Sequence, residues 1–202
     1  MVGVTLIELL IVVSILAILL GLAVPNLRTF YVNNRLGSAV NTVIAALSLA
    51  RNEAIRRGQP VTIVSLAGGQ NWTTGWTVCV DNGSSTNGNP FVPTGTCASG
   101  AANVIARGPA LDSALTLYSN AGLGSYVTFD ASGRSLRTNS TNLAGTFVIC
   151  YGSALKSGSM SMSRAVVITA AGRIRQAFDT NGDLIPNKDD VAQTNVASCT
   201  SP

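Results

Sequence analysis

The stretch VTLIELLIVVSILAILLGLAV, residues 4–24, decides how this chain is organised. Its 21 residues carry one charge, on Glu8, and their only other polar side chains are Thr5 and Ser14. At a rise of about 1.5 Å per residue, a helix of this length spans about 30 Å, the thickness of the hydrocarbon core of a bilayer. The pattern therefore predicts a membrane-embedded helix over residues 4–25.

A secretory signal peptide is the alternative for such an apolar run. It requires a basic segment in front, a shorter apolar run and a small-residue cleavage site behind it. No Lys or Arg precedes the run, and Pro25, Asn26, Leu27 and Arg28 follow it. We therefore expect a helix that stays in the membrane.

Glu8 is the exception within this apolar run. A carboxylate inside a membrane segment is costly, and it usually finds a partner or marks a function. The alternative is that Glu8 lies at the membrane interface, near the start of the helix.

Beyond Pro25 the pattern becomes amphipathic and predicts a second helical segment over residues 26–58. Pro25 removes a backbone hydrogen bond and clashes with the preceding turn, so we expect a kink or local melting there. Arg56 and Arg57 suit the negative end of a helix that stops at Gly58, and Pro60 enforces the stop. Steps of four and three residues place one apolar helix face on Leu36, Val40, Val43, Leu47, Ala50 and Ala54.

Residues 59–178 lose the helical period, and runs rich in Val, Thr, Phe and Tyr alternate with clusters of Gly, Asn and Ser. This alternation predicts β-strands joined by turns. The strands are expected near residues 61–66, 75–80, 102–107, 114–118, 126–130, 145–151, 164–170 and 172–178. Residues 81–100 are expected to form an exposed loop. The chain is thus predicted to be an α+β protein, with a long N-terminal helix packed on an antiparallel β-sheet domain.

Two segments of this domain echo each other. FDASGR at residues 129–134 and VITAAGR at residues 167–173 both have the pattern strand, turn, Gly-Arg. Trp72 and Trp76 stand at the start of a predicted strand, where tryptophan is more often part of the core than of a site.

The composition argues against an enzyme. Thirteen Lys and Arg against nine Asp and Glu give a net charge of +4, and the chain contains no His. The absence of His excludes Ser-His-Asp triads, Cys-His pairs and His-ligated zinc. Asp112 and Asp130, together with the many serines, form no recognisable acid–base constellation. We expect no catalytic residue and no cofactor.

The four cysteines, Cys79, Cys97, Cys150 and Cys199, show no C-x-x-C spacing, which disfavours a metal site. Three disulfide pairings are open to them. We favour Cys79–Cys97, which closes the Gly- and Ser-rich loop, and Cys150–Cys199, which ties the end of the chain to a strand. Free buried thiols are the alternative.

Charge is segregated along the second half of the chain. Residues 104–178 hold seven basic and two acidic side chains, a net +5, whereas residues 179–202 hold one basic and four acidic side chains, a net −3. We treat residues 179–202 as an acidic C-terminal tail.

The segment Gly172-Arg173-Ile174-Arg175 is the sharpest feature of the basic region. In an extended chain, Arg173 and Arg175 point the same way at a spacing of about 7 Å, which suits successive phosphates of a nucleic acid. Ile174 then faces the core, and Gly172 leaves the backbone bare for close approach. Arg134 and Arg137 are expected to extend this patch. The alternative is a solvated strand end whose arginines pair with the acidic tail.

The tail begins with Asp179-Thr180-Asn181-Gly182-Asp183, which suggests a calcium loop. The EF-hand pattern requires glycine at its sixth position, where this chain has Leu184. We therefore favour an Asx-type turn and no metal ligands, with calcium as the alternative.

The segment Gly3 to Val13, GVTLIELLIVV, resembles the prepilin signature of type IV pilins and type II secretion pseudopilins. The resemblance implies a leader over residues 1–3, cleavage by a prepilin peptidase between Gly3 and Val4, and methylation of the new N-terminus. It also implies that Glu8 pairs with the terminal amine of a neighbouring subunit during assembly. The family usually has Phe or Met where this chain has Val4.

Two further segments resemble one pilin subgroup, the GspH/FimT family of minor pseudopilins. They are residues 49–58, LARNEAIRRG, and Gly172 to Arg175, which looks like the G-R-x-R motif of FimT-type minor pilins. That motif is implicated in binding DNA during natural transformation. The resemblance implies a pilin-like fold, a single inner-membrane helix with a periplasmic domain, exposure on the cell surface in a pilus, and other pilins and double-stranded DNA as partners. The alternative is a minor pseudopilin of type II secretion that contacts partner pseudopilins or exported proteins.

Overall fold

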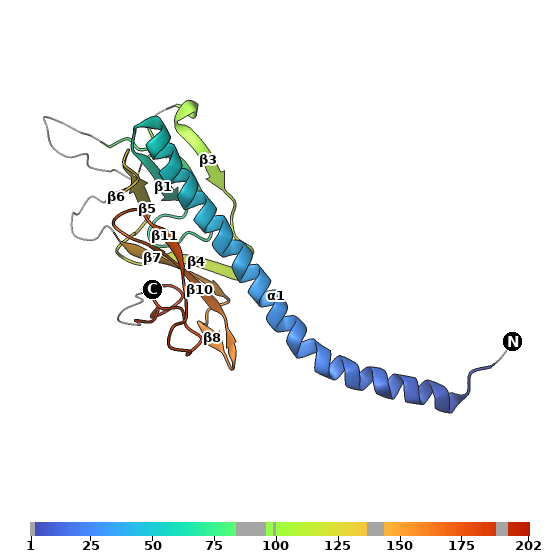
Figure 1. Cartoon of the computed structure of the whole chain (residues 1–202). Helices are drawn as coiled ribbons and strands as arrows, with labels where there is room; N and C mark the ends of the chain where they lie inside the picture. The colour runs from blue at the N-terminus through green and yellow to red at the C-terminus, as the bar shows by residue number, and fades with distance from the viewer. Residues whose placement is uncertain (1–2, 84–95, 99, 137–143, 189–193) are drawn as a thin grey trace, which may run out of the picture. The chain divides into compact units, whose positions relative to one another are not determined.

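The computed structural model of the chain describes residues 3–83, 96–98, 100–136, 144–188 and 194–202, and within the helix it leaves the side chains of residues 22–26 undescribed. The chain divides into two compact units, Met1–Arg35 and Leu36–Pro202, and each is described by itself (Figure 1).

A single helix, α1 (Leu6–Arg57), contains both predicted helical segments. The helix runs through Pro25 without interruption, so the expected local melting does not occur. Proline removes only one backbone hydrogen bond, and the turns on both sides keep theirs. Among the residues whose side chains are described, no helical stretch is long and apolar enough to cross a membrane. Residues 22–25 of the predicted span fall among the undescribed side chains.

The end of α1 confirms the predicted stop at Gly58. Gly58 has a φ of +64°, its N–H donates to the carbonyl of Ile55 (3.4 Å), and the N–H of Gln59 donates to the carbonyl of Ala54 (3.3 Å). These two bonds form a Schellman motif, which satisfies carbonyls that the last helical turn leaves open.

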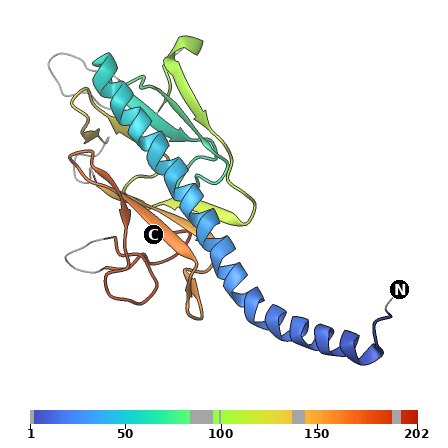
Figure 2. The same ribbon diagram turned by 45° about the vertical axis from the view of Figure 1, so that its right-hand side comes forward.

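The second half of α1 buries its predicted apolar face. Each side chain of the stripe has at most 4% of its surface exposed: Leu36, Val40, Val43, Leu47, Ala50 and Ala54. In both views this half of the helix lies along the strands (Figures 1 and 2). The periodicity therefore identified the packing face of the helix correctly.

One antiparallel sheet has five strands in the order β3-β2-β1-β5-β6. Their bounds are β1 Val61–Ser65, β2 Trp76–Val80, β3 Val104–Gly108, β5 Tyr126–Phe129 and β6 Ser135–Leu136. A short 3-10 helix, η1 (Ala101–Asn103), precedes β3.

A second antiparallel sheet has four strands in the order β11-β10-β7-β4. Their bounds are β4 Leu115–Ser119, β7 Gly145–Tyr151, β10 Ser163–Ile168 and β11 Ile174–Ala177. A small hairpin joins β8 (Lys156–Ser157) to β9 (Met160–Ser161). All eight predicted strands are present. Within the described segments the sequence missed β6, β8 and β9, which have two residues each, too few to show an alternation.

The C-terminal segment packs on one face of the four-stranded sheet. Val196 and Cys199 are buried there against Val148, Ala165 and Val167. The segment that the sequence separated as an acidic tail thus contributes to the hydrophobic core of the second unit.

Both favoured disulfides are present. Cys79 pairs with Cys97 across a separation of 18 residues, and Cys150 pairs with Cys199 across 49 residues. In the chain-entropy picture, loops of these lengths contribute about 3 and about 4 kcal/mol by restricting the unfolded chain.

Trp72 and Trp76 belong to the core, as expected, with 1% and 2% of their surfaces exposed. The indole N–H of Trp72 donates to the carbonyl of Gly124 (3.0 Å), and its ring meets Phe147 edge-on at 4.9 Å between centroids. The backbone N–H of Trp72 donates to the carbonyl of Leu117 in β4 (2.8 Å), which ties the β1–β2 connection to the second sheet.

Candidate nucleic-acid interface

The turn between β5 and β6 contains the first Gly-Arg pair. The N–H of Asp130 donates to the carbonyl of Arg134 (3.0 Å), and the N–H of Gly133 donates to the carbonyl of Asp130 (2.9 Å). Gly133 has a φ of +78°, the left-handed conformation that glycine adopts without a steric cost.

The turn between β10 and β11 repeats this geometry with the second Gly-Arg pair. The N–H of Thr169 donates to the carbonyl of Arg173 (3.0 Å), the N–H of Gly172 donates to the carbonyl of Thr169 (2.8 Å), and φ of Gly172 is +75°. The sequence echo therefore marks two turns with the same backbone hydrogen bonds, one in each sheet.

The tips of these two turns touch. A Cβ atom on Gly172 would lie 1.8 Å from the carbonyl oxygen of Gly133, so no side chain fits there. The bare backbone of Gly172 was expected to allow a close approach, and in the structure the turn that contains Gly133 occupies the side where a Cβ would lie. The sequence did not show this, because the contact joins two turns 39 residues apart.

Arg51 of α1 binds at the same contact between the two turns. Its Nε donates to the carbonyl oxygen of Gly133 (2.8 Å), and a Cβ on Gly133 would come within 2.8 Å of Cδ1 of Ile55. The last turns of α1 therefore pack directly against the first Gly-Arg turn. This gives a structural role to residues 49–58, which by themselves read as a charged helix end.

The contact presents one arginine from each turn. Arg134 and Arg173 directly follow the two touching glycines, and both are exposed. Nε of Arg134 lies 3.5 Å from Oδ2 of Asp130, while the guanidinium of Arg173 has no hydrogen bond or ion pair within the described part of the chain. We call Arg134 and Arg173 the turn arginines.

The other two arginines of the predicted patch differ from the turn arginines. Arg175 lies in β11 opposite Val167, on the face that the C-terminal segment covers, and is half-buried. Ile174 lies opposite the buried Ile168. Arg137 lies outside the described residues.

Further basic residues of this region lie on other elements. Arg164 of β10 is half-buried, its Nη1 donates to Oγ of Ser161 (3.0 Å) and to the carbonyl of Ser163 (2.7 Å), and desolvation lowers its pKa. Lys156 of β8 donates to the backbone carbonyl of Asp183 (3.0 Å). The structure therefore gathers only part of the predicted positive charge at the two turns.

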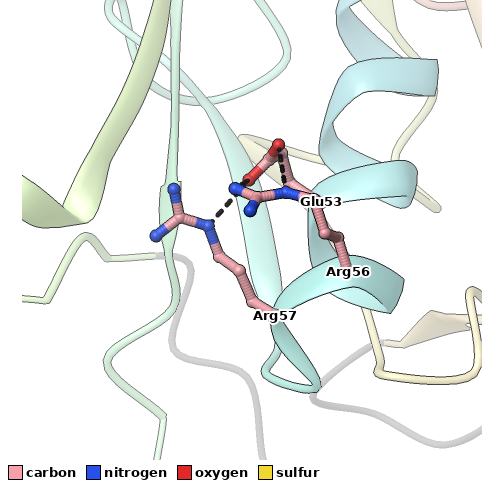
Figure 3. A network of polar contacts seen from close by, with 3 residues as sticks. All are labelled: Glu53, Arg56 and Arg57. Carbon is pink, nitrogen blue, oxygen red and sulfur yellow. Dashed lines mark hydrogen bonds and ion pairs between the residues drawn. The ribbon is translucent and has the colours of Figure 1, made fainter.

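Two arginines at the end of α1 are paired with one glutamate (Figure 3). The carboxylate of Glu53 accepts from Nε and Nη2 of Arg56 (3.0 and 2.6 Å) and from Nε of Arg57 (2.7 Å). These bonds, with that to Arg56 the strongest, lower the pKa of Glu53 to about 2.

The loop that begins at Asp179 forms Asx-type turns, as predicted. Oδ1 of Asp179 accepts from the N–H of Gly182 (2.8 Å), and Oδ2 accepts from the N–H of Leu184 (2.7 Å). The backbone N–H of Ile185 and the amide of Asn195 lower the pKa of Asp183. Within the described ranges no group of three or more His, Cys, Asp or Glu is placed to hold a metal ion, and Asp189 and Asp190 lie outside them.

Comparison with known proteins identifies the family. The model of the GspH family, described as type II transport protein GspH, matches residues 39–172. The chain belongs to the GspH family. No curated protein matches the chain.

Crystal structures of a minor pilin confirm the pilin-like fold of this GspH-family chain. The type IV minor pilin FimU of Pseudomonas aeruginosa resembles it in two crystal forms, both at 22% identity. The first has a TM-score of 0.55 over 84% of this chain and 98% of that chain, and the second 0.52 over 81% and 99%. The minor pseudopilin EpsH of the type 2 secretion system of Vibrio cholerae has 14% identity and a TM-score of 0.43, over 70% of this chain and 95% of that chain.

The residues of the predicted prepilin signature lie around the start of α1: Gly3 and Val4 precede the helix, and Glu8 lies in its first turn. Gly3, Val4 and Glu8 are exposed. The carboxylate of Glu8 accepts from the N–H and the hydroxyl of Thr5 (2.9 Å each), and the N–H of Glu8 donates to the Thr5 hydroxyl (3.3 Å). This capping box forms the start of the helix, and the sequence pattern Thr-x-x-Glu is typical of it.

Three residues of the candidate interface were not predicted from the sequence to belong to it: Arg51, Asp130 and Gly133. The echo between residues 129–134 and 167–173 was the signal for Asp130 and Gly133, because it aligned both turns. Arg51 stood within a block of family resemblance, but its partner is a backbone atom, which side-chain patterns do not reveal.

Proposed function

We propose that this GspH-family protein is a minor pilin that binds double-stranded DNA through its turn arginines, for DNA uptake in natural transformation. The observation that carries the proposal is the contact between the two Gly-Arg turns, which places Arg134 and Arg173 on adjoining, fastened backbone segments. A guanidinium group binds phosphate oxygens with its fork of N–H donors, and it does so without reading the base sequence.

The turn arginines suit such binding because both are exposed and each lies in a turn that backbone hydrogen bonds hold in place. Each follows a glycine in a hydrogen-bonded hairpin turn, so little backbone entropy is lost on binding. We further propose that Arg175 and Arg137, the other two arginines of the predicted patch, supply additional positive charge for DNA binding.

We also propose that the chain enters a pilus in the way its N-terminal signature implies. A prepilin peptidase cleaves between Gly3 and Val4, the helix of residues 4–25 lies in the inner membrane, and Glu8 pairs with the terminal amine of a neighbouring subunit. An ammonium group is the partner that offsets the cost of a buried carboxylate. The domain then faces the periplasm, an oxidising compartment that permits the disulfides Cys79–Cys97 and Cys150–Cys199.

DNA binding is tested with the full-length chain in a neutral detergent and a fluorescent duplex of about 30 base pairs. Replacing Arg134 and Arg173 together by Gln removes the guanidinium groups of both turns. We expect the log–log salt slope to become less steep by about 0.9 for each phosphate contact that is lost, and the affinity at about 0.1 M salt to fall roughly 10- to 100-fold. Arg107→Gln, at an exposed position of β3, is the matched control. Equal binding by the parent and the double variant would refute the proposal.

A second candidate is a minor pseudopilin of type II secretion. The observation that favours it is the matching family model, whose description names type II transport. Deleting the gene and assaying both exported enzymes and transformation separates the two candidates. A secretion defect with normal transformation would favour the pseudopilin.

A further inference from the structure

The two Gly-Arg turns share a backbone but differ in their first residue. Asp130 opens the first turn, and its Oδ1 accepts from the N–H groups of Ser132 and Arg134 (2.9 Å each) and from the Ser132 hydroxyl (2.6 Å). In the second turn the equivalent residue is Thr169, whose hydroxyl accepts from the N–H of Arg173 (3.2 Å). A neutral oxygen therefore suffices to cap this turn, and the charge of Asp130 is not needed for its shape.

The charge of Asp130 acts on Arg134 instead. Oδ2 of Asp130 lies 3.5 Å from Nε of Arg134, and 22% of the aspartate side chain and 63% of the arginine side chain are exposed. Asp130 and Arg134 of the first turn therefore carry no net charge together, whereas Arg173 gives the second turn a net positive charge. A phosphate that binds Arg134 has to displace this carboxylate or lie beside it.

We propose that Asp130 limits the affinity of this surface for DNA by holding Arg134 in an ion pair that a backbone phosphate must replace. The inference rests on the proposed function, because it concerns the same two turns. Arg173 makes the first phosphate contact, and Arg134 joins only when the nucleic acid outcompetes Asp130. The surface thus binds a polyanion reversibly, which suits a strand that is held and then released.

Asp130→Asn tests the proposal because an amide oxygen replaces Oδ1 and accepts the same three hydrogen bonds. The amide nitrogen that replaces Oδ2 carries no negative charge, so Arg134 is released. With the full-length chain in detergent and the same duplex, we expect DNA to bind about five- to tenfold more tightly at about 0.1 M salt. The log–log salt slope should steepen by about 0.9, the value for one more phosphate contact.

Three further variants test whether the effect acts through Arg134. Asp112→Asn makes the same change in net charge at an exposed aspartate that caps the N–H of Ala114, and it should leave the salt slope near that of the parent. Adding Arg134→Gln to Asp130→Asn should abolish the gain. Asp130→Thr, which copies the second turn, should reproduce the gain if the asparagine variant folds poorly.

The outcomes separate this inference from the proposed function. If the parent binds DNA and neither Asp130→Asn nor Asp130→Thr strengthens that binding, the inference alone is overturned. A gain that Asp112→Asn matches, or that persists without Arg134, would overturn it as well, because it would be an effect of net charge. No DNA binding by the parent or by either Asp130 variant would overturn the proposed function and the inference together.

Discussion

The carbonyl oxygen of Gly133 fills the space that a side chain on Gly172 would need, 1.8 Å from the position of its Cβ. This contact joins the β5–β6 turn of one sheet to the β10–β11 turn of the other. The surroundings of the two glycines explain why glycine precedes each of the turn arginines. Both glycines have positive φ angles, a side chain on Gly172 would overlap the Gly133 carbonyl, and a side chain on Gly133 would meet Ile55 of α1.

Gly172→Ala should destabilise the domain through two effects. The positive φ costs a non-glycine residue about 1–3 kcal/mol, and the overlap with the Gly133 carbonyl adds to that cost. Gly152→Ala is the matched control, because Gly152 has a φ of +76° and open space around its Cβ position. Urea unfolding of the two variants should show a clearly larger loss for Gly172→Ala. Equal losses would mean that the contact between the turns contributes nothing.

Arg51→Lys should weaken the same junction while conserving charge. Lysine lacks the Nε–H that donates to the Gly133 carbonyl, and losing such a bond at a half-buried site costs about 1 kcal/mol. We expect lower stability in urea and weaker DNA binding, because the turn arginines lose part of their support. Arg107→Lys, at an exposed position of β3, is the control. If Arg51→Lys binds DNA as the parent does, Arg51 has no positioning role.

Much of the fold could be predicted because the relevant signals are local. The stripe from Leu36 to Ala54 follows the helical period, and the strands follow short β-branched and aromatic runs between turn residues. The disulfide Cys79–Cys97 was favoured because it closes one loop, and the structure contains it.

The candidate site could be predicted only in part, because its decisive contact is tertiary. The residue pattern does not show how the two sheets meet, so it could not bring Gly133 against Gly172 or Arg51 onto that junction. It treated Arg173 and Arg175 as neighbours on one extended strand, but β11 begins only at Ile174. A motif of four residues therefore identified the segment but not the geometry that supports it.

The two disulfides should contribute unequally to stability. Replacing Cys150 and Cys199 by Ala opens a loop of 49 residues and should cost about 4 kcal/mol, against about 3 kcal/mol for Cys79 and Cys97, whose separation is 18 residues. Cys150, Cys199 and Cys79 are also buried, so lost packing adds to both values. Urea unfolding under oxidising conditions gives the ranking. The reverse order would show that strand packing, rather than loop closure, dominates.

Glu53 should stabilise the end of α1 in a pH-dependent way. Arg56 and Arg57 lower its pKa from 4.5 to about 2, so the folded chain holds the proton less tightly than the unfolded chain does. Stability from this group is therefore fully present above about pH 4.5 and is lost as the pH falls towards 2. We expect the parent to melt at a higher temperature than Glu53→Gln at pH 7, and the difference to shrink steadily between pH 4.5 and pH 2.

Salt separates this electrostatic effect from a packing effect of the same substitution. Because the Arg56 side chain is 66% exposed, added salt should screen the pair and reduce the difference in melting temperature at pH 7. Glutamine has nearly the shape of protonated glutamate, so the two proteins should converge at low pH. A difference that stayed constant across pH and salt would show that Glu53 acts through its shape, and the ion pairs of Figure 3 would then carry no stability.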